Sequence, residues 1–248
     1  MIIIKSEQEI DIMRESGKVT GQILRDLEEL IKPGISTKEI DRFVESTIRR
    51  NGMIPTFKGY GGFPASACVS VNEEVVHGIP SKKRKLKEGD IVSVDVGATY
   101  KGYVSDAART YGVGNVDPEA QRLMDTAKAS FFEGLKFCKV GHRLSDISHA
   151  IQERVEREGF GVIVDFVGHG VGRAMHEEPQ IPNYGAPGRG PRLAKGMVFA
   201  IEPMITQGTY EVETLLDNWT VVTLDRKMAA HYENTVVITD GEPELLTL

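Results

Sequence analysis

The chain has 248 residues, of which 40% are hydrophobic and 27% charged, an ordinary globular composition that is long enough to bury a sizeable core. A formal net charge of −6 excludes a basic surface extending over the whole chain, so we expect no contact with DNA. Two cysteines are too few for a disulfide scaffold and no segment approaches the roughly 20 apolar residues of a membrane span, which together predict a cytoplasmic protein with no membrane contact.

The predicted helices come in two pairs. Ser6 with Glu9, and Ser36 with Glu39, form capping boxes ahead of apolar residues at helical spacing. Capping residues, Pro and Gly bound the helical patterns at residues 6–33, 36–51, 117–141 and 145–159, the fourth helix opening at Ser145.

Strand signals follow each helix pair. They cover residues 68–71, 91–96 and 103–113 in the first half, and 161–167, 198–201, 219–224 and 235–239 in the second. Two helices followed by strands, twice, predict an α+β fold in which helix pairs cover one face of a curved, mainly antiparallel β-sheet. The concave face is then free to hold a site.

The two halves are related by a constant offset. Asp95 closes the run that starts at Gly89, Glu202 closes the run that starts at Gly196, and 202 − 95 = 107. The same offset relates Lys32 to Lys139, Gly34 to Gly141, Ile40 to Ile147, Gly52 to Gly159 and Leu86 to Leu193. We therefore predict one catalytic domain, 1–248, with a pseudo-two-fold repeat of halves at about 1–114 and 115–248.

Five side chains form a candidate metal site. Lys101-Gly102 has the composition of a hairpin turn, which would place Asp95 and Asp106 about 5–8 Å apart on paired strands, where two carboxylates repel unless a cation lies between them. The candidate set is Asp95, Asp106, His169, Glu202 and Glu233. Four carboxylates and one imidazole suit two divalent ions with a bridging hydroxide, and the oxygen-rich ligands fit manganese, iron or cobalt better than zinc.

The chain resembles type I methionine aminopeptidase, a metallopeptidase of the pita-bread fold, over essentially all of its length. The resemblance rests on five stretches: Val76-His-Gly-Ile-Pro80, Asp90 to Asp106, Gly168-His-Gly-Val-Gly-Arg-Ala-Met-His-Glu-Glu-Pro179, Glu202-Pro203 and Tyr232-Glu-Asn-Thr235. The 33 residues from His169 to Glu202 leave no room for the subdomain that type II enzymes insert there. We expect no N-terminal domain of the kind found in aminopeptidase P and prolidase, which argues against these two enzymes.

The resemblance implies a function and a role for each residue. It implies hydrolysis of the initiator methionine from nascent polypeptides that have a small second residue. Asp95 and Asp106 would chelate one ion, His169 and Glu202 the other, with Asp106 and Glu233 bridging. Glu202 would also transfer protons. The methionine side chain and the scissile bond would be bound by Tyr60, Phe63, Cys68, His77, His176 and Trp219, with Phe57 tightening the pocket and Met175 softening it.

Two further expectations concern partners. Lys82-Lys-Arg-Lys-Leu-Lys87 is a basic run in an acidic chain, either a solvated surface or an electrostatic contact with ribosomal RNA. We expect a monomer. Alternative functions are a Xaa-Pro peptidase on the same fold and a non-catalytic peptide- or ribosome-binding protein; retention of all five ligands favours an enzyme. The turn Gly168–Gly172 lacks the spacing of a nucleotide-binding motif.

Overall fold

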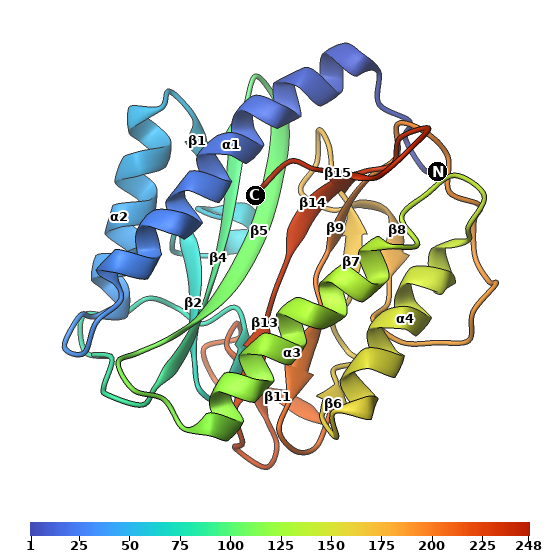
Figure 1. Cartoon of the computed structure of the whole chain (residues 1–248). Helices are drawn as coiled ribbons and strands as arrows, with labels where there is room; N and C mark the ends of the chain where they lie inside the picture. Colours follow the sequence, from blue (N-terminus) through green and yellow to red (C-terminus); the bar gives the residue numbers. More distant parts are fainter.

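Two helix pairs cover antiparallel sheets in the computed structural model, which describes all 248 residues (Figure 1). The helices are α1 (Glu7–Leu30), α2 (Thr37–Arg50), α3 (Pro118–Leu135) and α4 (Leu144–Arg157), and a short 3-10 helix covers Tyr60–Gly62. None of these helices combines the length and the apolar character that crossing a bilayer requires.

The helix ends follow from local hydrogen bonds. Ser6 and Ser36 each accept from the backbone of the glutamate three residues on, whose carboxylate accepts in return, as both capping boxes predict. Asp117 caps α3, which ends at Leu135, earlier than the predicted Gly141. The predicted start of α4 at Ser145 is wrong, because the Asp146 carboxylate accepts from the backbone N–H of Arg143 and the helix begins at Leu144.

The first half builds a four-stranded sheet around one long strand. This strand, β4 (Ile91–Tyr100), pairs with β1 (Ile54–Pro55), β2 (Ala67–Val71) and β5 (Tyr103–Gly112). The hairpin turn is where the sequence predicts it: Lys101 and Gly102 both have positive φ, at 46° and 80°, as a tight two-residue turn requires. In this register Asp106 pairs with Gly97, diagonal to Asp95 on the same face.

The second half builds a five-stranded sheet, and two small sheets complete the fold. Its order is β15 (Glu244–Leu245), β14 (Asn234–Val237), β9 (Val198–Ile201), β7 (Gly168–Gly170) and β8 (Glu177–Ile181). One small sheet joins β13 (Ala229–His231), β10 (Met204–Thr206) and β6 (Gly161–Val162), and the other joins β11 (Val212–Thr214), β12 (Val221–Thr223) and β3 (Glu74–Val76). All pairings between these strands are antiparallel.

The strand predicted at 161–167 is correct only for its first two residues. The remaining apolar residues are irregular, and Phe166 and Val167 line a cavity instead of pairing in a ladder. The sequence also missed β7, because Gly168 and Gly170 have low strand propensity. A Cβ at Gly170 would lie 2.3 Å from the Glu178 carbonyl oxygen, so glycine lets β8 approach closely.

The 107-residue offset is visible in the backbone. Helices α2 and α4 correspond, because the first residues and the last residues of the two helices are each 107 positions apart: 144 − 37 = 107 and 157 − 50 = 107. Strand β6 likewise corresponds to β1, 161 − 54 = 107. The isolated bridges Ser36–Lys85 and Arg143–Arg192 obey the same relation, and so do the strand pairs Ile54–Thr99 and Gly161–Thr206. The two halves therefore share the positions of their helices and strands and the register of strand pairing, as well as the sequence pattern.

A seam between β5 and the β13–β14 segment joins the halves. The backbone groups of Ala108 and Glu233 exchange hydrogen bonds of 3.4 and 3.0 Å. Beside this pair, the buried Thr235 hydroxyl accepts from the Asp106 N–H at 2.9 Å and donates to the Asp106 carbonyl at 2.8 Å. The Thr110 hydroxyl bridges the N–H and carbonyl of His231 in the same manner. Threonine hydroxyls thus continue the ladder from one half into the other.

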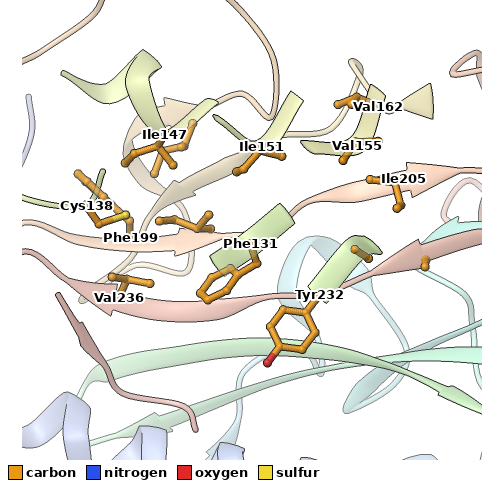
Figure 2. Packing of buried hydrophobic residues seen from close by; sticks show 14 of the residues in the cluster. Phe131, Cys138, Ile147, Ile151, Val155, Val162, Phe199, Ile205, Tyr232 and Val236 are labelled. Atoms are coloured by element: carbon orange, nitrogen blue, oxygen red, sulfur yellow. The ribbon is translucent and has the colours of Figure 1, made fainter. Parts of the chain in front are cut away.

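Each half has its own apolar core. In the second half α3 and α4 pack on β9, β10 and β14, and Phe131 lies at the centre, fully buried (Figure 2). Its ring contacts Tyr232 with centroids 5.4 Å apart, a tilted arrangement that aromatic pairs favour. In the first half α1 and α2 cover β2 and β4 through their aliphatic residues. The helices therefore hold the outer face, and the seam lies between the two cores.

We predict that Thr235→Val destabilises the fold while Thr235→Ser does not. Valine has nearly the same shape as threonine but removes both hydroxyl hydrogen bonds, leaving the N–H and carbonyl of Asp106 unpaired in a buried position, at a cost of about 2 kcal/mol or more. Urea denaturation of the purified variants measures this difference. Equal midpoints for the valine and serine variants would contradict the role assigned to the seam.

Candidate metal centre and substrate cavity

The five predicted ligands converge from both halves onto the seam. Asp95 lies on β4, Asp106 on β5 and His169 on β7, Glu202 directly follows β9, and Glu233 lies between β13 and β14. Donor atoms of Asp106, His169 and Glu233 all lie within 4.8 Å of one another. Donor atoms of Asp95 and Glu233 lie within the same limit of each other. Glu233 thus belongs to both groups, in the middle of the cluster.

The orientation of His169 is set by a backbone contact. Its Nδ1 lies 2.9 Å from the Gly170 carbonyl oxygen, which accepts the ring N–H. The opposite nitrogen, Nε2, lies 3.5 Å from both Asp106 Oδ2 and Glu202 Oε1. Such an arrangement is typical of metal-ligating histidines, whose second nitrogen donates to a carbonyl.

The carboxylates have too few hydrogen-bond partners for their burial. One oxygen of each of Asp95, Asp106 and Glu233 is buried with no hydrogen-bond partner. Burial, reinforced by the neighbouring carboxylates, raises the pKa of Asp95 and of Glu233 far above the ordinary range. Burial likewise raises the pKa of Glu202 to about 8. Cations would satisfy these oxygens and remove the repulsion, so the donor set fits divalent ions.

His231 lies beside these carboxylates, and the sequence analysis did not identify it as a candidate site residue. His231 is 2% exposed and its Nε2, which has no hydrogen-bond partner, lies 3.6 Å from Glu202 Oε2 and 3.7 Å from Glu233 Oε2. A signal for it exists, because residues two apart on an extended strand share a face, which places His231 beside Glu233.

A largely apolar cavity opens onto the carboxylates. All six residues predicted to bind substrate line it, together with Phe57 and Met175, and so do Val76, Phe166, Val167 and Met204, which the sequence did not single out. Trp219 packs edge-to-face on Phe63 with centroids 5.1 Å apart. Phe57 lies over Gly97, where a Cβ would come 2.5 Å from the ring, so the glycine makes room for the aromatic wall.

Two further histidines, His77 and His176, line the same cavity as the carboxylates. The Tyr60 hydroxyl lies 2.7 Å from His176 Nδ1, and the ring of His176 contacts that of His169 with centroids 4.4 Å apart. Burial, with the charge of His169 second, lowers the pKa of His176 to about 4. His77 has a positive φ of 60°, a strained conformation that residues at functional sites often adopt, and burial lowers its pKa as well. Both imidazoles are therefore neutral near pH 7.

Removing divalent ions is expected to make stability fall as pH rises. The raised pKa of Glu202, and those of Asp95 and Glu233, mean that the folded chain holds protons that the unfolded chain has released. This stabilisation is complete below the unfolded carboxyl pKa, about 4, and is lost as pH rises through the folded value, about 8 for Glu202. Although burial opposes it, Asp106 and Glu202 raise the pKa of His169 to about 9, which acts in the same direction.

Thermal unfolding of chelator-treated and metal-loaded protein at several values between about pH 5 and about pH 8 measures this effect. The Tm of the stripped protein should fall over this range, and the gap to the loaded protein should widen, because bound ions displace the protons. Parallel curves would contradict the assignment of the cluster as a cation site.

Comparison with known proteins agrees with this geometry. The profile of metallopeptidase family M24 matches residues 11–240. A methionine aminopeptidase of Clostridium acetobutylicum is 58% identical over all of this chain and 99% of its own length, and methionine aminopeptidase 1 of Bacillus subtilis is 53% identical with the same coverage. The crystal structure of a methionine aminopeptidase from Thermotoga maritima, 49% identical, matches with a TM-score of 0.98 over all of this chain and 99% of that one.

A prolidase from Pyrococcus furiosus shares the fold at a TM-score of 0.79 and 24% identity, with 65% of its chain covered. These matches confirm the predicted α+β pita-bread fold. The family profile and the close relatives together confirm the predicted family. The chain therefore belongs to metallopeptidase family M24, and within it to the methionine aminopeptidases.

Proposed function

We propose that the chain removes the initiator methionine from nascent polypeptides whose second residue is small. The observation that carries this proposal is an apolar cavity, walled by aromatic side chains and Met175, that opens directly onto the carboxylates of Asp95, Asp106 and Glu202. An unbranched thioether side chain suits such a cavity, where a few polar groups orient the reacting bond. The methionine aminopeptidases that resemble the chain over its full length support the same reaction.

The proposed cofactor is a pair of divalent ions held by the two ligand groups that the sequence implies. Asp95 and Asp106 would hold one ion, His169 and Glu202 the other, and Asp106 and Glu233 would contact both. When bound, such ions supply a water nucleophile at neutral pH and polarise the substrate carbonyl. The oxygen-rich donor set accepts manganese, iron, cobalt or zinc.

The remaining steps are assigned to side chains at the cavity. Glu202, one of the carboxylates that line the cavity, would accept a proton from the attacking water and pass it to the leaving amine. If the Tyr60 hydroxyl donates to His176 Nδ1, the Nε2 of His176 carries the hydrogen and can donate to the developing oxyanion. His77, across the cavity, would contact the scissile amide.

The test is digestion of Met-Ala, Met-Leu and Ala-Pro peptides by metal-stripped protein, with and without added manganese or cobalt, read by mass spectrometry. We expect metal-dependent release of methionine from Met-Ala and little from Met-Leu, because the resemblance implies a small second residue. Cleavage of Ala-Pro alone would move the assignment to the proline-specific relatives, and no cleavage with either metal would indicate a binding protein.

The role assigned to His176 is tested with the variant His176→Ala. Because this residue is assigned a donor role and no metal, the variant should keep its metal content and lose kcat by about 10- to 1000-fold. A variant that loses its metal would show that His176 belongs to the ligand set instead.

We further propose that Lys82–Lys87 contacts ribosomal RNA. The segment runs antiparallel to the start of α2, with hydrogen bonds from Thr37 N to the Arg84 carbonyl and from Leu86 N to the Ile35 carbonyl, so its backbone is held in place. Its four lysines are exposed, and the segment follows His77 by only five residues. A rigid basic strip this near the cavity could dock a phosphate backbone while a peptide enters.

Cosedimentation with ribosomes at increasing salt tests this second proposal. Replacing the four lysines of the strip by alanine should weaken binding and lower the slope of log affinity against log salt by about 3, because each lost phosphate contact removes about 0.7–0.9. The charge-matched control replaces four exposed lysines elsewhere: Lys18, Lys101, Lys136 and Lys195. Equal losses in both variants would contradict a specific contact.

A further inference from the structure

His231 has the geometry of a metal ligand. Its ring is buried and its Nε2 points at the carboxylates without a hydrogen-bond partner, 3.6 Å from Glu202 Oε2 and 3.7 Å from Glu233 Oε2. Donor atoms of Asp95, His231 and Glu233 all lie within 4.8 Å of one another. The residue thus completes a three-donor group on the Asp95 side of the cluster.

These separations fit a shared cation better than hydrogen bonds. An N–H donor and a carboxylate oxygen in a hydrogen bond lie about 2.7–3.2 Å apart, which is shorter than either distance. Two donors that each lie about 2.1 Å from one ion, about 120° apart, are separated by about 3.6 Å. The 3.7 Å between His231 Nε2 and Glu233 Oε2 is close to this value. His169, a proposed ligand, has the same relation to its neighbours, with Nε2 at 3.5 Å from two carboxylates.

The two imidazoles also lie beside different oxygens of Glu202. His169 Nε2 is nearest to Oε1 of that carboxylate and His231 Nε2 is nearest to Oε2. The backbone of His231 is fixed on both its N–H and its carbonyl by the Thr110 hydroxyl, so the ring enters the centre from a rigid strand. Positioning of this kind is what a ligand needs.

We propose that His231 is a sixth protein ligand of the metal centre, binding through Nε2 the ion that Asp95 and Glu233 also hold. The inference rests on the dinuclear centre of the proposed function and extends its donor set to four carboxylates and two imidazoles. Each ion would then have one imidazole, and a second nitrogen donor shifts the preference of the centre from manganese toward iron, cobalt and zinc.

Proton NMR of the full chain loaded with two equivalents of cobalt(II) tests the proposal. A ligating imidazole gives a strongly shifted, solvent-exchangeable N–H resonance, because the unpaired electrons of cobalt act through the bond. We expect two such resonances from the wild-type protein. His231→Gln should lose one of them and His169→Gln the other, while His149→Gln, on α4 outside the centre, should keep both.

A single shifted resonance in the wild-type protein, unchanged by His231→Gln, would overturn the proposal. The wild-type count alone decides the matter if the His231→Gln protein does not fold. Release of methionine from Met-Ala by the wild-type protein is a separate result: its presence with one resonance would refute the sixth ligand and leave the proposed function standing.

Discussion

The hydrogen-bonded seam between the two halves is the constraint on which the rest of the molecule depends. Ala108 and Glu233 pair through their backbones, and the hydroxyls of Thr110 and Thr235 extend that pairing by two residues on each side. This arrangement places Asp106 from one half against Glu233 from the other. Without it the chain would hold two incomplete groups of acids, and the helices would cover two separate sheets.

The seam brings carboxyl groups close together, which destabilises the fold electrostatically when no cation is bound. Four carboxyl groups lie in one small volume, three of them with a buried oxygen that has no hydrogen-bond partner. Burial alone penalises such groups, and their mutual repulsion adds to the penalty. The long β4–β5 hairpin and the two apolar cores hold them together regardless, so the structure accepts local instability where it gains affinity for cations.

The sequence predicted the repeat, the capping boxes and the Lys101-Gly102 hairpin because each depends on residues close together in the chain or on a strict periodicity. It also identified the four acids and the one imidazole of the proposed centre, through strand ends and family motifs. It failed at β7 and at 163–167, where glycine allows close approach and apolar residues face a cavity. It missed His231 because the burial of that ring depends on the seam, a contact between residues more than a hundred positions apart.

The distribution of donors between the halves has a consequence for when hydrolytic activity can arise. Asp95 and Asp106 belong to the first copy of the repeat, whereas His169, Glu202 and Glu233 belong to the second, so neither copy alone contains all the ligands of the proposed centre. The second copy leaves the ribosome last. A chain that is only partly synthesised, or whose halves have not paired, therefore has only part of the proposed ligand set in place. Competence to cut peptides is therefore coupled to completion of the fold, which keeps immature copies of a peptidase from acting on their neighbours.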